Sequence, residues 1–95
     1  MQFSRELRAD VEAGRITVSF RLWTRPQVKV GGHYPIGDRH FEVDDIELVP
    51  FSSVSAADVR KSGETDRESL RERAAHAAPI TDDTLVYRIE FHVVP

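Results

Sequence analysis

Residues 14–23 read Gly14-Arg15-Ile16-Thr17-Val18-Ser19-Phe20-Arg21-Leu22-Trp23. After the first two residues, apolar and polar side chains alternate, which is typical of a β-strand whose two faces differ. The apolar face holds Ile16, Val18, Phe20 and Leu22, and the opposite face holds Thr17, Ser19, Arg21 and Trp23. The pattern predicts a strand over residues 15–23 with its apolar face in the core. The other face is either a ligand-binding surface or an ordinary solvated face.

Size and composition set the class of protein. The chain has 95 residues, of which 40% are hydrophobic and 31% charged, so we expect a single domain over residues 1–95. Cysteine is absent, which excludes disulfides, thiolate metal ligands and a cysteine nucleophile. The four histidines form no closely spaced pair, so we expect neither a metal nor another cofactor. No apolar run is long enough for a membrane span, and the N-terminus lacks the order of a signal peptide. We therefore expect a cytoplasmic protein without a membrane segment.

Charge is unevenly distributed along the chain. The net charge is −3, which argues against nucleic-acid binding by the whole surface. Between Glu12 and Asp38, however, there is no acidic residue. Four cations lie in this interval, namely Arg15, Arg21, Arg25 and Lys29. This segregation predicts a local anion-binding patch on the first strand, unless it reflects chance in a short chain.

Turn and cap residues divide the rest of the chain into elements. Ser4 is a candidate N-cap for a helix over about residues 5–13, which Gly14 ends. A short strand over 27–30 and a turn region over 33–38 come next, followed by a strand over 39–48. Its apolar spacing changes near Asp44 and Asp45, which predicts a β-bulge. Ser55 begins a second helix, which Gly63 stops. Thr65 begins a third helix over about residues 66–78. The last strand covers residues 85–94.

The order of these elements predicts the fold class. One helix comes first, strands follow, and a helical excursion stands before the last strand. Short strands, glycines and a bulge are typical of small barrels rather than of a βαβ sheet. We therefore predict an α+β protein with a small mixed β-barrel. The last strand has the longest apolar alternation and should pair in the centre of the sheet.

Several short motifs resemble the ASCH domain family. They are Gly-Arg-x-Thr-x-Ser-x-Arg from Gly14, Gly-x-x-Tyr ending at Tyr34, Arg-x-Phe-Glu-Val from Arg39 and Val-Tyr-Arg-Ile-Glu-Phe from Val86. The resemblance covers nearly the whole chain. It implies a β-barrel similar to the PUA RNA-binding domain, with a pocket between the motif strand and the following helical segment. It also implies RNA or modified nucleosides as ligands.

The family signature has a lysine where this chain has Ile16. Its other positions correspond to Gly14, Thr17, Ser19 and Arg21. Some small ASCH members resemble amidohydrolases that remove the acetyl group of N4-acetylcytidine with this lysine, a later hydroxyl and a glutamate. Ile16 can neither activate a nucleophile nor stabilise an anion. Glu64 lies near the family's acidic position, so Ser19 and Glu64 are what remains of that set.

We therefore predict a PUA-like domain that binds RNA or a modified nucleoside through the polar face of residues 15–23. Hydroxyls recognise a base edge, cations contact phosphates and aromatic rings stack on an unpaired base. The predicted binding residues are Thr17, Ser19, Arg21, Trp23, Arg25, Lys29 and Tyr34, with Glu64 closing the pocket from the helical side.

Other functions remain open on the sequence alone. A hydrolase acting on a nucleoside or on RNA would use Ser19, Tyr34 and Glu64 in an altered catalytic set. A metal-free ribonuclease would combine Tyr34 and Arg21 with His33 and Lys29. A serine triad would pair Ser19 with a carboxylate and one histidine, but no nucleophile elbow surrounds any serine. The available partners are His33, His40, His76, His92, Asp44 and Asp45. A protein-interaction module built on the acidic helices is the third class.

Overall fold

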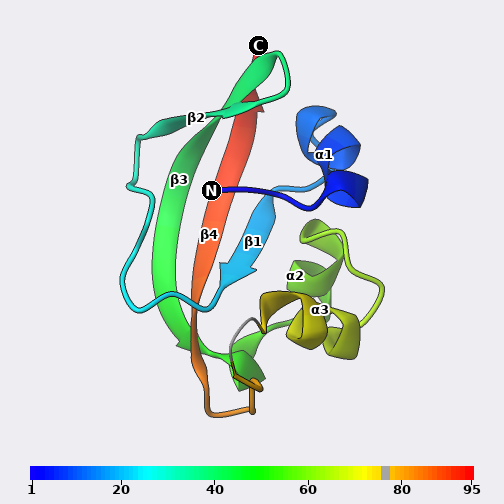
Figure 1. Ribbon diagram of the computed structural model, residues 1–95, viewed down its shortest axis with the longest axis vertical. Coiled ribbons are helices and arrows are strands. Elements are labelled where there is room, and N and C mark those ends of the chain that lie inside the picture. The colour runs from blue at the N-terminus through cyan, green and yellow to red at the C-terminus, as the bar shows by residue number, and fades with distance from the viewer. Residues whose placement is uncertain (76–77) are drawn as a thin grey trace.

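A computed structural model describes residues 1–75 and 78–95, and its centre is one antiparallel sheet. The elements are α1 (Arg5–Glu12), β1 (Val18–Arg21), β2 (His33–Ile36), β3 (Arg39–Pro50), the 3-10 turn η1 (Phe51–Ser53), α2 (Ala56–Lys61), α3 (Arg67–Ala74) and β4 (Leu85–Val94). The strands lie in the order β1-β4-β3-β2. The three helices lie on the side of the molecule next to β1 (Figure 1). None of the helices in these ranges is long and apolar enough to cross a membrane.

The two long strands follow the sequence prediction. β4 covers residues 85–94 and pairs with both β1 and β3, so the predicted central strand is confirmed. β3 continues to Pro50, slightly beyond its predicted end. Its register against β4 shifts between Val43 and Asp45, which confirms the predicted bulge. One extra residue there brings the side chains of β3 back into phase with the core.

The predicted small mixed β-barrel is not closed, because the sheet is open over the described residues. β1 and β2 form its two edges. The segment 27–30 is not a strand, and the second edge strand comes from His33–Ile36, where we expected a turn. Pro35 made this segment look like a turn, but an edge strand tolerates proline because one of its sides makes no ladder bonds. The first strand is also shorter than predicted and covers only residues 18–21.

Two groups of buried side chains stabilise this arrangement. The first lies between α1 and the sheet and contains Val11, Phe41 and Phe91; the Phe41 and Phe91 ring centroids are 5.1 Å apart. The second joins β1 to the other helices and contains Phe20, Leu70 and residues around them. Both faces of β1 are therefore covered. Ser19 is only 8% exposed, so the idea of an openly solvated polar face is wrong.

Helix ends show which caps were predicted correctly. Ser55 caps α2 and accepts a hydrogen bond from the Asp58 amide at 3.0 Å, as expected. Asp66, rather than Thr65, caps α3, and α3 ends at Ala74 instead of reaching 78; residues 76 and 77 lie outside the described ranges. Ser4 stands at the N-cap position of α1 without a capping hydrogen bond from its side chain.

Candidate functional site

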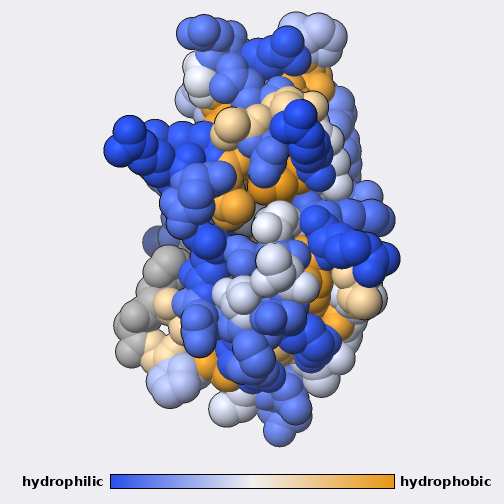
Figure 2. Space-filling model, turned by 90° about the vertical axis from the view of Figure 1, so that its right-hand side faces the viewer, coloured by the Kyte–Doolittle hydropathy of each residue, from blue (hydrophilic) through white to orange (hydrophobic). Residues whose placement is uncertain are grey.

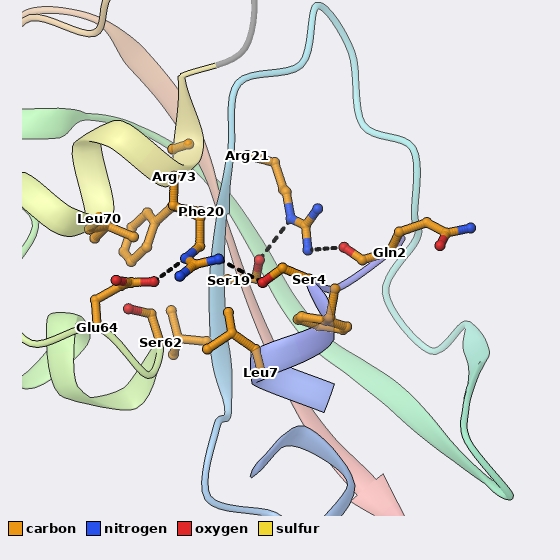
Figure 3. Close-up of a pocket in the computed structure, with 13 residues that line it drawn as sticks. Gln2, Ser4, Leu7, Ser19, Phe20, Arg21, Ser62, Glu64, Leu70 and Arg73 are labelled. Carbon is orange, nitrogen blue, oxygen red and sulfur yellow. Dashed lines mark hydrogen bonds and ion pairs between the residues drawn. The ribbon is translucent and has the colours of Figure 1, made fainter. Parts of the chain in front are cut away.

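A cavity of about 350 Å³ lies between β1, α3 and the segment that precedes α1 (Figure 3). Most of its wall is apolar, and six polar or charged side chains reach it besides Gln2. The apolar residues are Phe3, Leu7, Val18, Phe20, Leu70 and Ala74, and the polar ones are Ser4, Ser19, Arg21, Ser62, Glu64 and Arg73. On the face that carries the helices, apolar side chains reach the surface between hydrophilic ones (Figure 2). An apolar pocket with a few converging polar groups is the usual form of a small-ligand site.

Ser19 and Arg21 enter the cavity from β1. They are two residues apart in a strand, so their side chains point to the same side. The Arg21 Nε donates to the Ser19 Oγ at 2.8 Å, and its Nη2 donates to the Gln2 carbonyl at 2.6 Å. The guanidinium carbon also lies 5.2 Å from the centroid of the Phe3 ring. Burial lowers the pKa of Arg21 to about 10, so this side chain is still a cation at neutral pH.

Glu64 and Arg73 form the helical side of the cavity. Glu64 follows the end of α2, and only 7% of its side chain is exposed. It accepts a hydrogen bond from the Arg73 Nε in an ion pair. The Arg73 Nη1 also donates to the Ser4 Oγ at 2.6 Å and lies 3.3 Å from the Glu6 Oε1. Arg73 thus ties α3 to both the start of α1 and the end of α2.

Three predicted site residues, Ser19, Arg21 and Glu64, line this one cavity. Thr17 does not, because it borders a separate depression near Glu12 and His92. Its backbone also bridges two elements, since its amide donates to the Lys61 carbonyl at 2.9 Å and its carbonyl accepts from the Phe91 amide at 3.0 Å. Thr17 therefore links two elements through its backbone and lies outside the cavity that Ser19 lines.

The aromatic and loop residues of the prediction also lie elsewhere. Trp23 packs on the first core with its ring centroid 6.2 Å from that of Tyr87. The Tyr34 ring lies 5.6 Å from the Phe41 ring, and its hydroxyl accepts from the Lys29 amide at 3.0 Å. Arg25 is exposed in the loop after β1. None of these four residues, Trp23, Arg25, Lys29 and Tyr34, lines the cavity.

Sequence reasoning missed the residues that complete the cavity. Arg73, Leu70 and Ser62 come from the helical segments, and Gln2 and Ser4 come from the N-terminal segment. Local patterns give no signal for them, because the fold alone brings Ser4 and Arg73 together across most of the chain. Glu64, which the family resemblance suggested, also lines this cavity.

The position of the family lysine is part of the core. Ile16 is 2% exposed and belongs to the first buried cluster. It does not line the cavity. The Ser19 hydroxyl is engaged by Arg21, and no histidine in the described ranges borders the cavity. A serine triad is therefore not assembled there, and His76 lies outside the described residues.

The other histidines of interest sit on the sheet. His33, Glu42 and His92 are directly opposite one another on β2, β3 and β4. The His92 Nδ1 lies 2.9 Å from both carboxylate oxygens of Asp44. Within residues 1–75 and 78–95, no group of three or more side chains is arranged to hold a metal ion.

The pKa of His92 gives a testable pH dependence. The hydrogen bond that the His92 ring donates to the Asp44 carboxylate raises this pKa above its ordinary value. A raised pKa in the folded state adds stability below the unfolded pKa of about 6.5, and this stability is lost as the pH rises through the folded value. We expect NMR titration of the His92 ring to show the raised pKa. In Asp44→Asn it should fall, and an unchanged pKa in that variant would contradict the assigned cause.

The comparisons with known proteins identify the fold. No protein-family model matches the sequence, and no curated protein does. An ASCH domain from Lactobacillus crispatus matches the structure with a TM-score of 0.72 and 18% identity, covering 93% of this chain and 70% of the other. A DUF984 protein from Enterococcus faecalis matches with a TM-score of 0.72 and 19% identity, covering 94% of this chain and 67% of the other. The resemblance seen in the motifs thus holds at the level of structure, and the chain has the fold of the ASCH domain.

Proposed function

We propose that the cavity beside β1 binds a nucleoside-sized ligand, either a modified nucleoside or an unpaired nucleotide of RNA. The observation that carries this proposal is the convergence of Ser19, Arg21 and Glu64 on one cavity. These residues come from the motif strand and from the helical segment after it. The fold that the chain shares with the ASCH domain is compatible with such a ligand.

The walls of the cavity suit a base. A volume of about 350 Å³ is at the small end of the range of ligand pockets, roughly 300–1,000 Å³. The apolar side chains of Phe3, Phe20 and Leu70 can cover the faces of a base. At the edge of the ring, the Ser19 hydroxyl can donate or accept a hydrogen bond, and the Glu64 carboxylate can accept one. Compared with the sequence prediction, the binding surface is now a cavity and not a whole strand face.

A second candidate function is hydrolysis of a modified nucleoside. It is favoured by one observation, that the Ser19 hydroxyl and the Glu64 carboxylate border the same cavity. Against it, Glu64 pairs with Arg73, Ser19 pairs with Arg21, and Ile16 replaces the family lysine. Neither group is seen to activate the other. Binding therefore accounts for the geometry with fewer assumptions.

The test compares two hydroxyls of the same segment. Calorimetric titration with N4-acetylcytidine and with a short single-stranded RNA would give the affinities of the wild type, Ser19→Ala and Thr17→Ala. We expect Ser19→Ala to weaken binding about tenfold, because the lost hydroxyl leaves polar groups in the cavity unpaired. Thr17→Ala should stay within about twofold of the wild type, since Thr17 lies outside the cavity.

The outcomes separate the candidates. The proposed cavity would be contradicted if neither probe binds, or if Ser19→Ala and Thr17→Ala lose the same amount of affinity. Chromatography of the N4-acetylcytidine mixture tests the second candidate at the same time. Release of cytidine and acetate that stops in Ser19→Ala would make the protein a hydrolase.

A further inference from the structure

The two arginines of the cavity differ in how their charges are compensated. Arg73 pairs with two carboxylates, those of Glu64 and Glu6. The partners of Arg21 among residues 1–75 and 78–95 are both neutral, namely the Ser19 hydroxyl and the Gln2 carbonyl. No carboxylate in residues 1–75 and 78–95 lies within ion-pair distance of Arg21.

The Arg21 guanidinium is half-buried at the wall of the cavity, and no carboxylate among the described residues pairs with it. Transfer of a charge out of water is compensated only when an opposite charge or a full set of hydrogen bonds replaces the water. The lowered pKa of Arg21, about 10, reflects this loss of solvation. A partly desolvated charge at the wall of a cavity is a candidate for a ligand-binding group.

The geometry of Arg21 leaves room for one more partner. Nε and Nη2 are engaged, while Nη1 makes no hydrogen bond to the described part of the chain. Figure 3 shows the guanidinium between Ser19 and Gln2, on the side of the cavity away from the Glu64–Arg73 pair. A planar guanidinium binds phosphate oxygens through two parallel N–H groups, and a backbone carbonyl is a weaker partner than an anion.

We propose that Arg21 binds a phosphate group of the ligand, so that the cavity takes a nucleotide in preference to a neutral nucleoside. This inference rests on the proposed function. The phosphate replaces the Gln2 carbonyl at Nη2 and occupies Nη1. Arg73 takes no part in anion binding, because Glu64 and Glu6 already neutralise it. The phosphate belongs either to a free nucleoside monophosphate or to the backbone of an RNA strand.

The first experiment follows the side-chain Nε–H signals of Arg21 and Arg73 by NMR during titration with inorganic phosphate. This probe needs no knowledge of the base. We expect the Arg21 signal to shift and to saturate while the Arg73 signal stays in place. Shifts of equal size at both arginines, or no shift at Arg21, would overturn the proposal.

The second experiment compares N4-acetylcytidine, its 5′-monophosphate and a trinucleotide RNA on the wild type, Arg21→Met, Arg21→Lys and Arg25→Met. Arg25→Met removes the same charge from the exposed loop and is the matched control. In the wild type and in Arg25→Met, the monophosphate should bind about tenfold more tightly than the nucleoside. Arg21→Met should abolish this preference, and Arg21→Lys should keep part of it because the charge remains.

The three probes also show where the phosphate comes from. They further separate the phosphate inference from the proposed function on which it rests. A preference for the trinucleotide alone, lost in Arg21→Met, assigns the phosphate to an RNA backbone. Equal affinity for nucleoside, monophosphate and trinucleotide would overturn the inference and leave the proposed function standing. Failure of all three probes to bind would overturn both. If Arg21→Met does not fold, Arg21→Lys and the phosphate titration decide.

Discussion

Replacing Ile16 by lysine is expected to lower the free energy of unfolding by roughly 3 kcal/mol and to produce no amidohydrolase activity. Ile16 is 2% exposed in the first core. The change removes the burial of a large apolar side chain, worth about 1.5–3 kcal/mol, and places an ammonium group in apolar surroundings. The new amine would not reach the substrate, because position 16 does not line the cavity. Urea denaturation and a deacetylation assay on N4-acetylcytidine measure the two effects.

Ile16→Met is the matched control for this change. It keeps the volume and the apolar character, so the loss should stay below about 1.5 kcal/mol. A stable Ile16→Lys protein that hydrolyses N4-acetylcytidine would show that position 16 belongs to the site after all. A lysine at position 16 would then act in the cavity, although the isoleucine found there is buried in the core.

Gly63→Ala is expected to lower the free energy of unfolding by roughly 3 kcal/mol. Gly63 follows α2 with φ +86°, a conformation that is strained for any residue with a Cβ. A Cβ here would also lie 2.5 Å from the Ile16 Cδ1 and 3.0 Å from its Cγ1. Strain and overpacking add to each other. The change acts directly before Glu64, so it should also weaken ligand binding.

Two further variants separate the two causes. Gly14→Ala meets the same strain at φ +81° with nothing within 4 Å of the new Cβ, so it should lose only about 1 kcal/mol. Ile16→Val in the Gly63→Ala background removes the clashing Cδ1 and should recover part of the loss. Equal destabilisation by the two alanines in urea denaturation would contradict the close contact between Gly63 and Ile16.

The strands that the sequence predicted well are those with long local patterns. The alternation over residues 85–94 and the phase change at Asp44–Asp45 depend only on neighbouring residues, and both are confirmed. The edge strand at His33–Ile36 was missed because a proline stands inside it, and proline is compatible with an edge as well as with a turn. Closure of the barrel depends on contacts between distant segments, which no local pattern contains.

The candidate site could be predicted only in part for the same reason. Ser19 and Arg21 share one side of a strand, so their proximity follows from spacing. Trp23 was placed with them by extending the alternation, but the strand ends at Arg21 and the indole turns to the core. Arg73 could not be foreseen, since its position depends on α3 packing against the start of α1. Among the described residues no carboxylate pairs with Arg21, and this too follows only from the three-dimensional arrangement.

The most direct test of the central claim is an amide chemical-shift map of the wild type during titration with N4-acetylcytidine 5′-monophosphate. We expect saturable shifts at the cavity residues Ser19, Ser62, Glu64 and Leu70, which lie on β1 and on the helical segments. The exposed loop with Arg25 and Lys29 should change little. Shifts confined to that loop, with none in the cavity, would contradict the proposed site. They would show that the ligand binds at the exposed cations Arg25 and Lys29.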